Sequence, residues 1–410
     1  MSAWSIEWVE SSNGVTDAKG FRASGVSCDI RGKGNGQLDI GMVYSSSPCA
    51  VAGTFTSNRV KAAPVLLDQS RVRSGRPVHG VIANSGNANA CTGDEGYANA
   101  EAQVALAEGL SGRTGGSFLV CSTGRIGRQM PMDKVKKGIH AAWESLGDDV
   151  SHGHAFSQCI LTSDTRPKRC GVILRNGARE VRIAACAKGA GMIRPDMATM
   201  LAFVVTDLGC EQGDLQGLLS EAVEDSFNSI TVDGDMSTND TVLLLANGAS
   251  GVSLDAADAE LRSAFLKGLS TVCERLAYLI VGDGEKISKV VTVKIVGAPD
   301  RESARKVAYS IAHSALVKSS WAGSDPNWGR VLCAAGYSGL PVKESDMSMY
   351  YDACPVVKNG RVLDENLSQW REIVSKKEFS IVLDVGMGHA EARLLASDLT
   401  PEYIEFNMHE

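Results

Sequence analysis

The 410-residue sequence predicts a mixed α/β protein, because stretches with an apolar period of two alternate with stretches of period 3.6. Several of the strand-like runs are apolar on both faces, which indicates sheets that are covered on both sides. Forty-three glycines against 6% aromatic residues indicate small-residue packing and many tight turns rather than disorder.

Helices are predicted where apolar residues recur every three or four positions. These segments are about 132–146, led by Pro131, about 214–226, about 257–280, and the stretch after Ser303, which we take as an N-cap. Strands are predicted where short apolar runs are bounded by turn residues. These runs are 78–83, 117–121, 201–206, 241–245, 290–295 and 380–385.

The turn-rich stretch 296–300 (VGAPD) is the best candidate for a domain boundary. We therefore expect a larger domain over residues 1–296 and a smaller one over residues 297–410.

Composition excludes several classes of protein. Lys and Arg (41) are interspersed with Asp and Glu (48) at a net charge of −7, so neither a nucleic-acid patch nor a polybasic membrane patch is present. No apolar run approaches the ~20 residues that span a bilayer. The first ten residues carry two acids and no base, unlike a secretory or transit peptide, so we expect a cytoplasmic protein.

The eleven cysteines include no C-x-x-C pair, so we expect free thiols, buried where they lie in apolar runs, as do Cys121 and Cys333.

The usual catalytic motifs are absent. The sequence has no G-x-S-x-G elbow, no phosphate-binding P-loop and no H-E-x-x-H pair. The glycine-rich stretch 32–36 lacks a βαβ context and is interpreted as a hairpin turn. His152 and His154 are interpreted as part of a polar loop, because no further ligands lie nearby, and we expect no metal.

The most informative stretch is residues 188–201, KGAGMIRPDMATML. A glycine-rich turn and a proline lead to Ala198-Thr199 at the start of an apolar strand. Taken by itself, this pattern favours a loop that enters a buried strand, with Thr199 as an ordinary strand former.

Seven further segments of the chain match the sequence motifs of a known family, and they change that interpretation. They are residues 14–21 (GVTDAKGF), 56–65 (TSNRVKAAPV), 84–93 (NSGNANACTG), 121–127 (CSTGRIG), 161–165 (LTSDT), 226–240 (SFNSITVDGDMSTND) and 325–330 (DPNWGR). With these blocks in order around the 188–201 motif, nearly the whole chain resembles the ornithine acetyltransferase (glutamate N-acetyltransferase) family of arginine biosynthesis.

The resemblance implies self-cleavage between Ala198 and Thr199, which would give an α chain of residues 1–198 and a β chain of residues 199–410. The chemistry is coherent, because a Thr hydroxyl needs a neighbouring base. The freed α-amine of Thr199, with an ordinary pKa near ~8, would lie beside its own Oγ. Thr199 is therefore expected to be the nucleophile, with its α-amine as the base.

Further site residues are implied by position in the family's motifs. Thr123 and Gly124 match the pair that forms an oxyanion hole, and Thr162, Lys188 and Glu285 match substrate-binding residues. A lysine can hold the carboxylate of an amino acid, and a glutamate can neutralise its amino group.

The spacing of Asp233, Asp235 and Asn239 lacks the other ligands of a calcium loop, so turn and capping roles are expected there.

This sequence departs from the family's pattern near its end. Asn407 matches a substrate contact, but the Tyr-Thr-Thr-like stretch that usually follows, whose last Thr binds substrate, has no counterpart before Glu410. Lys286 replaces a commonly small residue after Glu285. We expect weaker or broader recognition of the amino acid, unless Lys286 or the terminal carboxylate of Glu410 supplies the missing contact.

The resemblance implies an αββα sandwich core, of the N-terminal-nucleophile type, with a smaller C-terminal α/β domain. It also implies processed chains that assemble into a heterotetramer. The expected reaction is ping-pong transfer of the acetyl group of N2-acetylornithine to L-glutamate, without a cofactor, and acetyl-CoA as a second donor stays open. The alternatives are a self-processed amidase or aminopeptidase, an N-acyltransferase with another amino-acid substrate, and an unprocessed, non-enzymatic relative.

Overall fold

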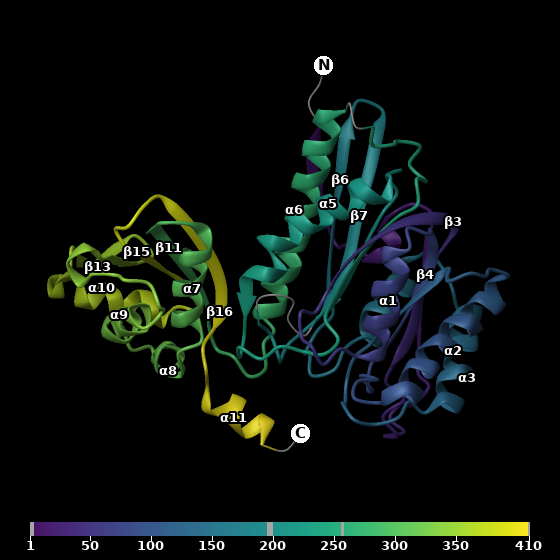
Figure 1. The fold of residues 1–410 in the computed structure, drawn as a ribbon, viewed down its shortest axis with the longest axis horizontal. Coiled ribbons are helices and arrows are strands. Elements are labelled where there is room, and N and C mark those ends of the chain that lie inside the picture. Colours follow the sequence, from purple (N-terminus) through teal and green to yellow (C-terminus); the bar gives the residue numbers. More distant parts are fainter. Residues whose placement is uncertain (1–3, 195–199, 256–257, 409–410) are drawn as a thin grey trace. The chain divides into compact units, whose positions relative to one another are not determined.

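The computed structural model describes residues 4–194, 200–255 and 258–408. The chain divides into two compact units (Figure 1). The first comprises the described parts of Met1–Gly189, Asp196–Asn228 and Met236–Ile280, and the second those of Ala190–Pro195, Ser229–Asp235 and Val281–Glu410. The expected boundary at 296/297 falls inside a strand of the second unit, β11 (Val290–Ala298).

The strands of the first unit follow one path, β1-β6-β7-β8-β10-β3-β4-β5, with β2 paired to β3. Their bounds are β1 (Ser5–Trp8), β2 (Phe21–Val26), β3 (Ile40–Phe55), β4 (Val78–Asn84), β5 (Phe118–Ser122), β6 (Lys168–Asn176), β7 (Arg179–Lys188), β8 (Leu201–Thr206) and β10 (Thr241–Ala246). The long strand β3 changes partners along its length: residues 40–45 pair with β2, and residues 50–55 pair with β10. Strand β3 therefore belongs to two sheets: one contains β2, β4 and β5, and the other contains β1, β6, β7, β8 and β10.

The two sheets pack face to face. Val43, Val81 and Leu119 of one sheet share a buried apolar cluster with Leu201 and Phe203 of the other. Strand β8 is buried along its whole length, because it lies between β7 and β10 and both of its faces are covered.

Helices cover the outer face of each sheet. The bounds of the helices in this unit are α1 (Ala63–Arg73), α2 (Gly93–Ser111), α3 (Met132–Glu144), α4 (Val150–Cys159), α5 (Gln212–Glu224) and α6 (Ala259–Val281). Apolar residues of α1, α2 and α3 pack on β3, β4 and β5. Helix α6 lies against β6 and β7, where Gly268 approaches Leu174 and Ile183 (Figure 1). Helix α5 lies beside α6, and an ion pair of 2.7 Å joins Asp214 of α5 to Arg262 of α6. The order of layers is helix, sheet, sheet, helix, which confirms the expected αββα core.

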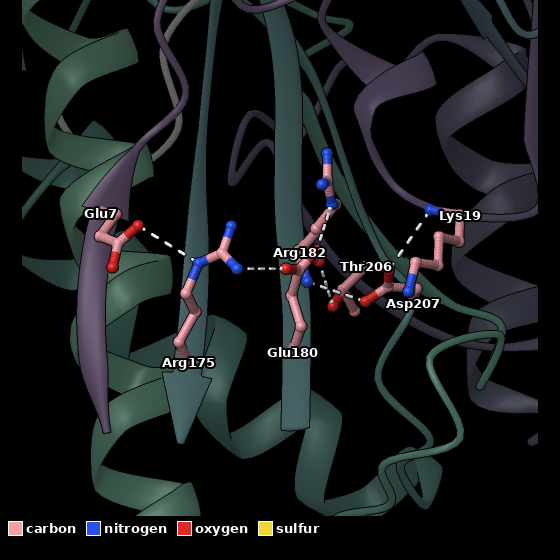
Figure 2. Close-up of polar contacts among 7 residues, drawn as sticks. All are labelled: Glu7, Lys19, Arg175, Glu180, Arg182, Thr206 and Asp207. Carbon is pink, nitrogen blue, oxygen red and sulfur yellow. Dashed lines mark hydrogen bonds and ion pairs between the residues drawn. The ribbon is translucent and has the colours of Figure 1, made fainter. Parts of the chain in front are cut away.

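Polar contacts fasten β1, β6, β7 and β8 to one another (Figure 2). Arg175 of β6 contacts Glu7 of β1 at 3.2 Å and Glu180 of β7 at 2.8 Å. Asp207, directly after β8, accepts hydrogen bonds from the backbone N–H groups of Arg182 and Lys19. Together these contacts link β1, β6 and β7 to one another and join the segment around Lys19 to the end of β8.

The second unit is a sheet with helices. Its strand order is β14-β13-β12-β15-β11-β16-β9, with β9 (Ile230–Thr231), β12 (Ser348–Tyr351), β13 (Cys354–Lys358), β14 (Arg361–Val362), β15 (Glu378–Asp384) and β16 (Ala390–Ser397). The helices are α7 (Arg301–Ala312), α8 (Ala315–Ala322), α9 (Trp328–Gly336), α10 (Leu367–Ser375) and α11 (Pro401–Asn407). Trp321 and Trp370 are buried in one apolar cluster with Val293 and Ile381 of the sheet, so this unit is also α/β.

Local sequence explains where the predicted helices begin. Helix α7 starts at Arg301, because Asp300, not Ser303, is the N-cap: its carboxylate accepts the N–H of Ser303 at 2.7 Å. The glycine-rich stretch 32–36 lies in the connection between the antiparallel strands β2 and β3, as a hairpin requires.

Two sequence-based expectations are wrong. His152 and His154 lie in helix α4, not in a loop, because the Asp149 carboxylate caps that helix by accepting the N–H of Ser151 and His152. Cys333 is exposed on α9, whereas Cys121 is buried as expected.

No helix of the described residues is long and apolar enough to cross a membrane.

Candidate active site

The predicted cleavage site, Ala198-Thr199, lies outside the described residues. The chain is described again from Met200, which is buried and directly precedes β8. The backbone N–H of Met200 donates to Oδ1 of Asp240 at 3.0 Å, and its carbonyl accepts the N–H of Thr241 at 3.1 Å. Both the N–H and the carbonyl of Met200 are thus hydrogen-bonded, which fixes the backbone where β8 begins.

The Thr123–Gly124 turn follows directly after β5, at the end of a strand that is buried along its whole length. The backbone N–H of Thr123 donates to the carbonyl of Asn84 at 3.0 Å, and Thr123 is buried. Because that N–H is occupied, the hydroxyl is the group through which Thr123 would contact a substrate oxygen.

Gly124 has a φ of +128°, a region that side chains rarely adopt. A Cβ atom there would lie 2.4 Å from the backbone carbon of Gly86, so only glycine fits against the loop that follows β4. The loop is itself fixed by Asn84, whose Nδ2 donates to the carbonyl of Asn87 at 3.0 Å. The Thr123–Gly124 turn is therefore rigid.

Three buried side chains, those of Asp164, Lys168 and Lys188, form a cluster with the half-buried Thr162, and we call these four residues the Asp164 cluster. Lys168 Nζ lies 2.6 Å from Asp164 Oδ1, and Lys188 Nζ lies 3.7 Å from Asp164 Oδ2. The backbone N–H of Thr162 donates to Asp164 Oδ2 at 3.1 Å. The structure therefore brings two predicted substrate-binding residues, Thr162 and Lys188, to one carboxylate.

Burial by itself would raise the pKa of the Asp164 carboxyl. The charges of Lys188 and Lys168, with hydrogen bonds from Lys168 and from the N–H of Gly189, outweigh burial and hold the pKa well below its ordinary value. Asp164 is thus an anion between two buried ammonium groups, and the cluster carries an excess of positive charge that suits the carboxylate of an amino acid.

In the second unit, Glu285 and Asn407 lie together, with Asn407 Nδ2 donating to Glu285 Oε2 at 3.2 Å. A Cβ atom at Gly191 would lie 2.5 Å from Glu285 Oε1, so the glycine of the 188–201 motif allows the chain to approach that carboxylate. The Lys286 ammonium lies 5.3 Å from the centre of the Phe406 ring, a cation–π contact. Glu410 lies outside the described residues.

Asp233 has the turn role that the sequence predicts. Its carboxylate accepts the N–H groups of Met192 at 2.7 Å and of Ile193 and Asp235 at 3.0 Å. Among the described residues, no group of three or more His, Cys, Asp or Glu side chains could hold a metal ion.

A cavity of about 790 Å³ lies elsewhere in the first unit, where Trp8, Arg169 and Arg275 are among its lining residues. None of the predicted site residues that the structure describes lines it. We place the candidate site at the Asp164 cluster and the Thr123–Gly124 turn, because these carry the groups that acyl transfer needs, and not at this larger, open groove.

Sequence reasoning missed Asp164, Lys168 and Asp240 as parts of the site. Asp164 stood in a matching block, but its partner Lys188 lies 24 residues later in the sequence and reaches it only when β6 and β7 pair. A signal for Lys168 was its spacing, four residues after Asp164 in a charged turn.

A four-layer αββα core, a strand-end Thr–Gly turn and a buried lysine beside a carboxylate are the features that the resemblance implies for an acyltransferase of the N-terminal-nucleophile type. The chain belongs to the ArgJ family, whose model matches residues 22–409. This confirms the resemblance that the sequence blocks indicate.

Curated relatives agree over nearly the full length. The "Arginine biosynthesis bifunctional protein ArgJ" of Symbiobacterium thermophilum is 40% identical over 98% of this chain and 99% of its own. The protein of the same name from Geobacter sulfurreducens is 41% identical over 95% and 98%. Among solved structures, an ornithine acetyltransferase from Mycobacterium tuberculosis, complexed with ornithine, is 37% identical over 47% of this chain and 98% of that chain, with a TM-score of 0.42.

Proposed function

We propose that this ArgJ-family enzyme moves the acetyl group of N2-acetylornithine to L-glutamate through an acetyl ester on Thr199. The relatives are named as bifunctional proteins of arginine biosynthesis, which supports acetyl transfer in that pathway. The observation that carries the assignment to this chain is the Asp164 cluster, where Lys188 and Thr162, both implied by the family's motif, meet at one buried carboxylate.

The reaction takes place in two halves. Thr199 Oγ attacks the acetyl carbonyl, its proton passes to the Thr199 α-amine, and the amide C–N bond breaks as ornithine leaves with that proton. The α-amine of glutamate then attacks the ester carbonyl and gives a proton to the Thr199 α-amine, and the ester C–O bond breaks as that proton restores the Thr199 hydroxyl. In each half a negative charge develops on the acetyl oxygen, where the Thr123 hydroxyl and the Gly124 N–H act as donors.

Binding uses charges of both signs. The Lys188 ammonium holds the α-carboxylate of the amino acid, with Thr162 beside it. Separately, the family's motif implies that Glu285, whose carboxylate accepts a hydrogen bond from Asn407, contacts an amino group of the substrate. Acetyl-CoA is proposed as a second acetyl donor, and no cofactor takes part.

The active form follows self-cleavage at Ala198–Thr199 into chains 1–198 and 199–410. We further propose that these chains pair into a heterotetramer in the cytoplasm. Charges interspersed along a chain of net charge −7 suit a protein that binds neither nucleic acid nor membrane.

Denaturing mass spectrometry and glutamate dependence test the proposal. The purified protein is expected as two fragments with Thr199 at the second N-terminus, and Thr199→Ala is expected as one intact chain. Beyond one equivalent per active site, release of ornithine should require glutamate and should equal the amount of acetylglutamate formed. Full-length protein that remains active contradicts the nucleophile, and continued turnover of ornithine without glutamate would instead indicate an amidase.

A further inference from the structure

Asn239 and Asp240 lie side by side in the chain, directly before β10, and both are buried. Their side chains reach the ends of two strands that belong to different sheets, β5 and β8. Because no ladder of backbone hydrogen bonds joins β5 to β8, the strand pairing itself does not fix the separation of these ends.

Asn239 contacts the β5 side. Its Nδ2 donates to the carbonyl of Ser122 at 2.8 Å and to that of Ala88 at 2.6 Å. Its Oδ1 accepts the hydroxyl of Thr238 at 2.6 Å. Ser122 directly precedes Thr123, so this amide holds the base of the Thr123–Gly124 turn.

Asp240 contacts the β8 side. Its Oδ1 accepts the N–H of Met200 at 3.0 Å, and Met200 directly follows Thr199 in the chain. Its Oδ2 is buried and has no hydrogen-bond partner among the described residues. Burial raises the pKa of this carboxyl well above its ordinary value, against the opposing effects of the Met200 N–H and the Lys188 charge.

We propose that Asn239 and Asp240 are positioning residues that set the distance between the Thr123–Gly124 turn and the first residues of β8. The inference rests on the proposed function, since it concerns the approach of an oxyanion hole to a nucleophile at residue 199. Acyl transfer needs this geometry held closely, because a misplacement of ~1 Å costs about 10² in rate.

Asn239→Asp tests the Asn239 contacts. The variant keeps the shape of the side chain but places a carboxylate oxygen against two carbonyl oxygens. We expect conversion of the precursor to two chains to slow by about 10², and kcat of the cleaved fraction to fall similarly with little change in KM.

Asn247→Asp is the matched control, because Asn247 is also buried and follows the other end of β10. Its Nδ2 donates to the carbonyl of Lys19 at 2.9 Å and to Ser45 Oγ at 3.3 Å. The control is expected to lower the melting temperature as much as Asn239→Asp does, while it is processed at the wild-type rate. If both variants slow processing equally, or neither does, the positioning role is overturned.

A second pair of variants tests whether Asp240 acts as the hydrogen-bond acceptor for the Met200 N–H or only by the size of its side chain. Asp240→Leu removes the acceptor for the Met200 N–H and is expected to accumulate precursor, whereas Asp240→Asn keeps an acceptor oxygen and should recover most of the loss. Processing of Asp240→Leu at the wild-type rate contradicts the proposal. A wild-type chain that is never cleaved contradicts the proposed function instead, so the two failures are distinguishable.

Discussion

Lys188 Nζ lies 3.7 Å from Asp164 Oδ2, and both side chains are excluded from solvent. The same carboxylate also binds Lys168. One buried carboxylate thus pairs with two buried ammonium groups, and the consequences for stability and for binding can be measured separately.

Asp164→Ala should destabilise the protein strongly, because it removes a carboxylate that pairs with two buried ammonium groups, those of Lys168 and Lys188. Removal of one partner of a buried pair costs about 3–5 kcal/mol of the free energy of unfolding. Urea denaturation measures this loss. The control is Glu7→Ala, which removes the exposed pair with Arg175 and should cost no more than about 1 kcal/mol. Similar costs for the two variants would contradict the buried-pair interpretation.

The pH dependence of stability follows from the lowered pKa of Asp164. The unfolded carboxyl titrates near ~3.9 and the folded one lower, so the folded state binds fewer protons between these values. The stabilisation is therefore fully present above about pH 5 and is lost as the pH falls through the folded pKa. Below about pH 4 the wild type should lose stability more steeply than Asp164→Asn, measured by denaturation at successive pH values.

Gly124→Ala should prevent formation of the Thr123–Gly124 turn, because the new Cβ meets the backbone of Gly86 at 2.4 Å. We expect loss of self-cleavage and of transfer activity. Gly127→Ala is the control in the same loop: Gly127 also has a positive φ, of +78°, but no atom lies within 4 Å of the methyl group that alanine would add. Equal effects of both changes would mean that backbone strain, not the close approach, decides the outcome.

Thr123→Ala tests the hydroxyl alone. Removal of one oxyanion donor lowers kcat by about 10²–10³, and KM should change little because the contact strengthens mainly in the transition state. The backbone contact of Thr123 with Asn84 is retained in the variant, so the turn stays in place. An unchanged kcat in the fully cleaved variant would exclude Thr123 from the site.

The sequence predicts strand β8 over its full observed length, because a buried strand between two turns leaves an uninterrupted apolar run. It does not reveal the Asp164 cluster. That cluster depends on the antiparallel register of β6 and β7, which pairs Lys168 with Ala187 and so brings Lys168 and Lys188 to the same end of the hairpin. The short connection between Asn176 and Arg179 sets this register, and the sequence-based prediction did not pair these two strands.

The helix that carries His152 shows the opposite failure, since its local sequence looks like a loop. Gly153 and several polar residues have weak helix propensity. The cap from Asp149 and the close packing of Gly153 on the carbonyl of Asn13 stabilise the helix, and the second contact is tertiary.

The last prediction concerns the choice of amino acid. Glu285→Gln keeps the hydrogen-bonding shape beside Asn407 but removes the negative charge that would pair with a δ-ammonium. A hydrogen bond to a charged group contributes roughly 1.5–3 kcal/mol, so KM for N2-acetylornithine should rise by about 10- to 100-fold. Steady-state kinetics with N2-acetylated ornithine, lysine and norvaline, with glutamate as acceptor, measure the effect. Acetylnorvaline lacks the side-chain amine, so the wild type should discriminate strongly against it and Glu285→Gln should not. Asn407→Ala, which leaves the charge in place, should raise KM less. If Glu285→Gln retains the preference of the wild type for acetylornithine over acetylnorvaline, the charge of Glu285 does not select the substrate.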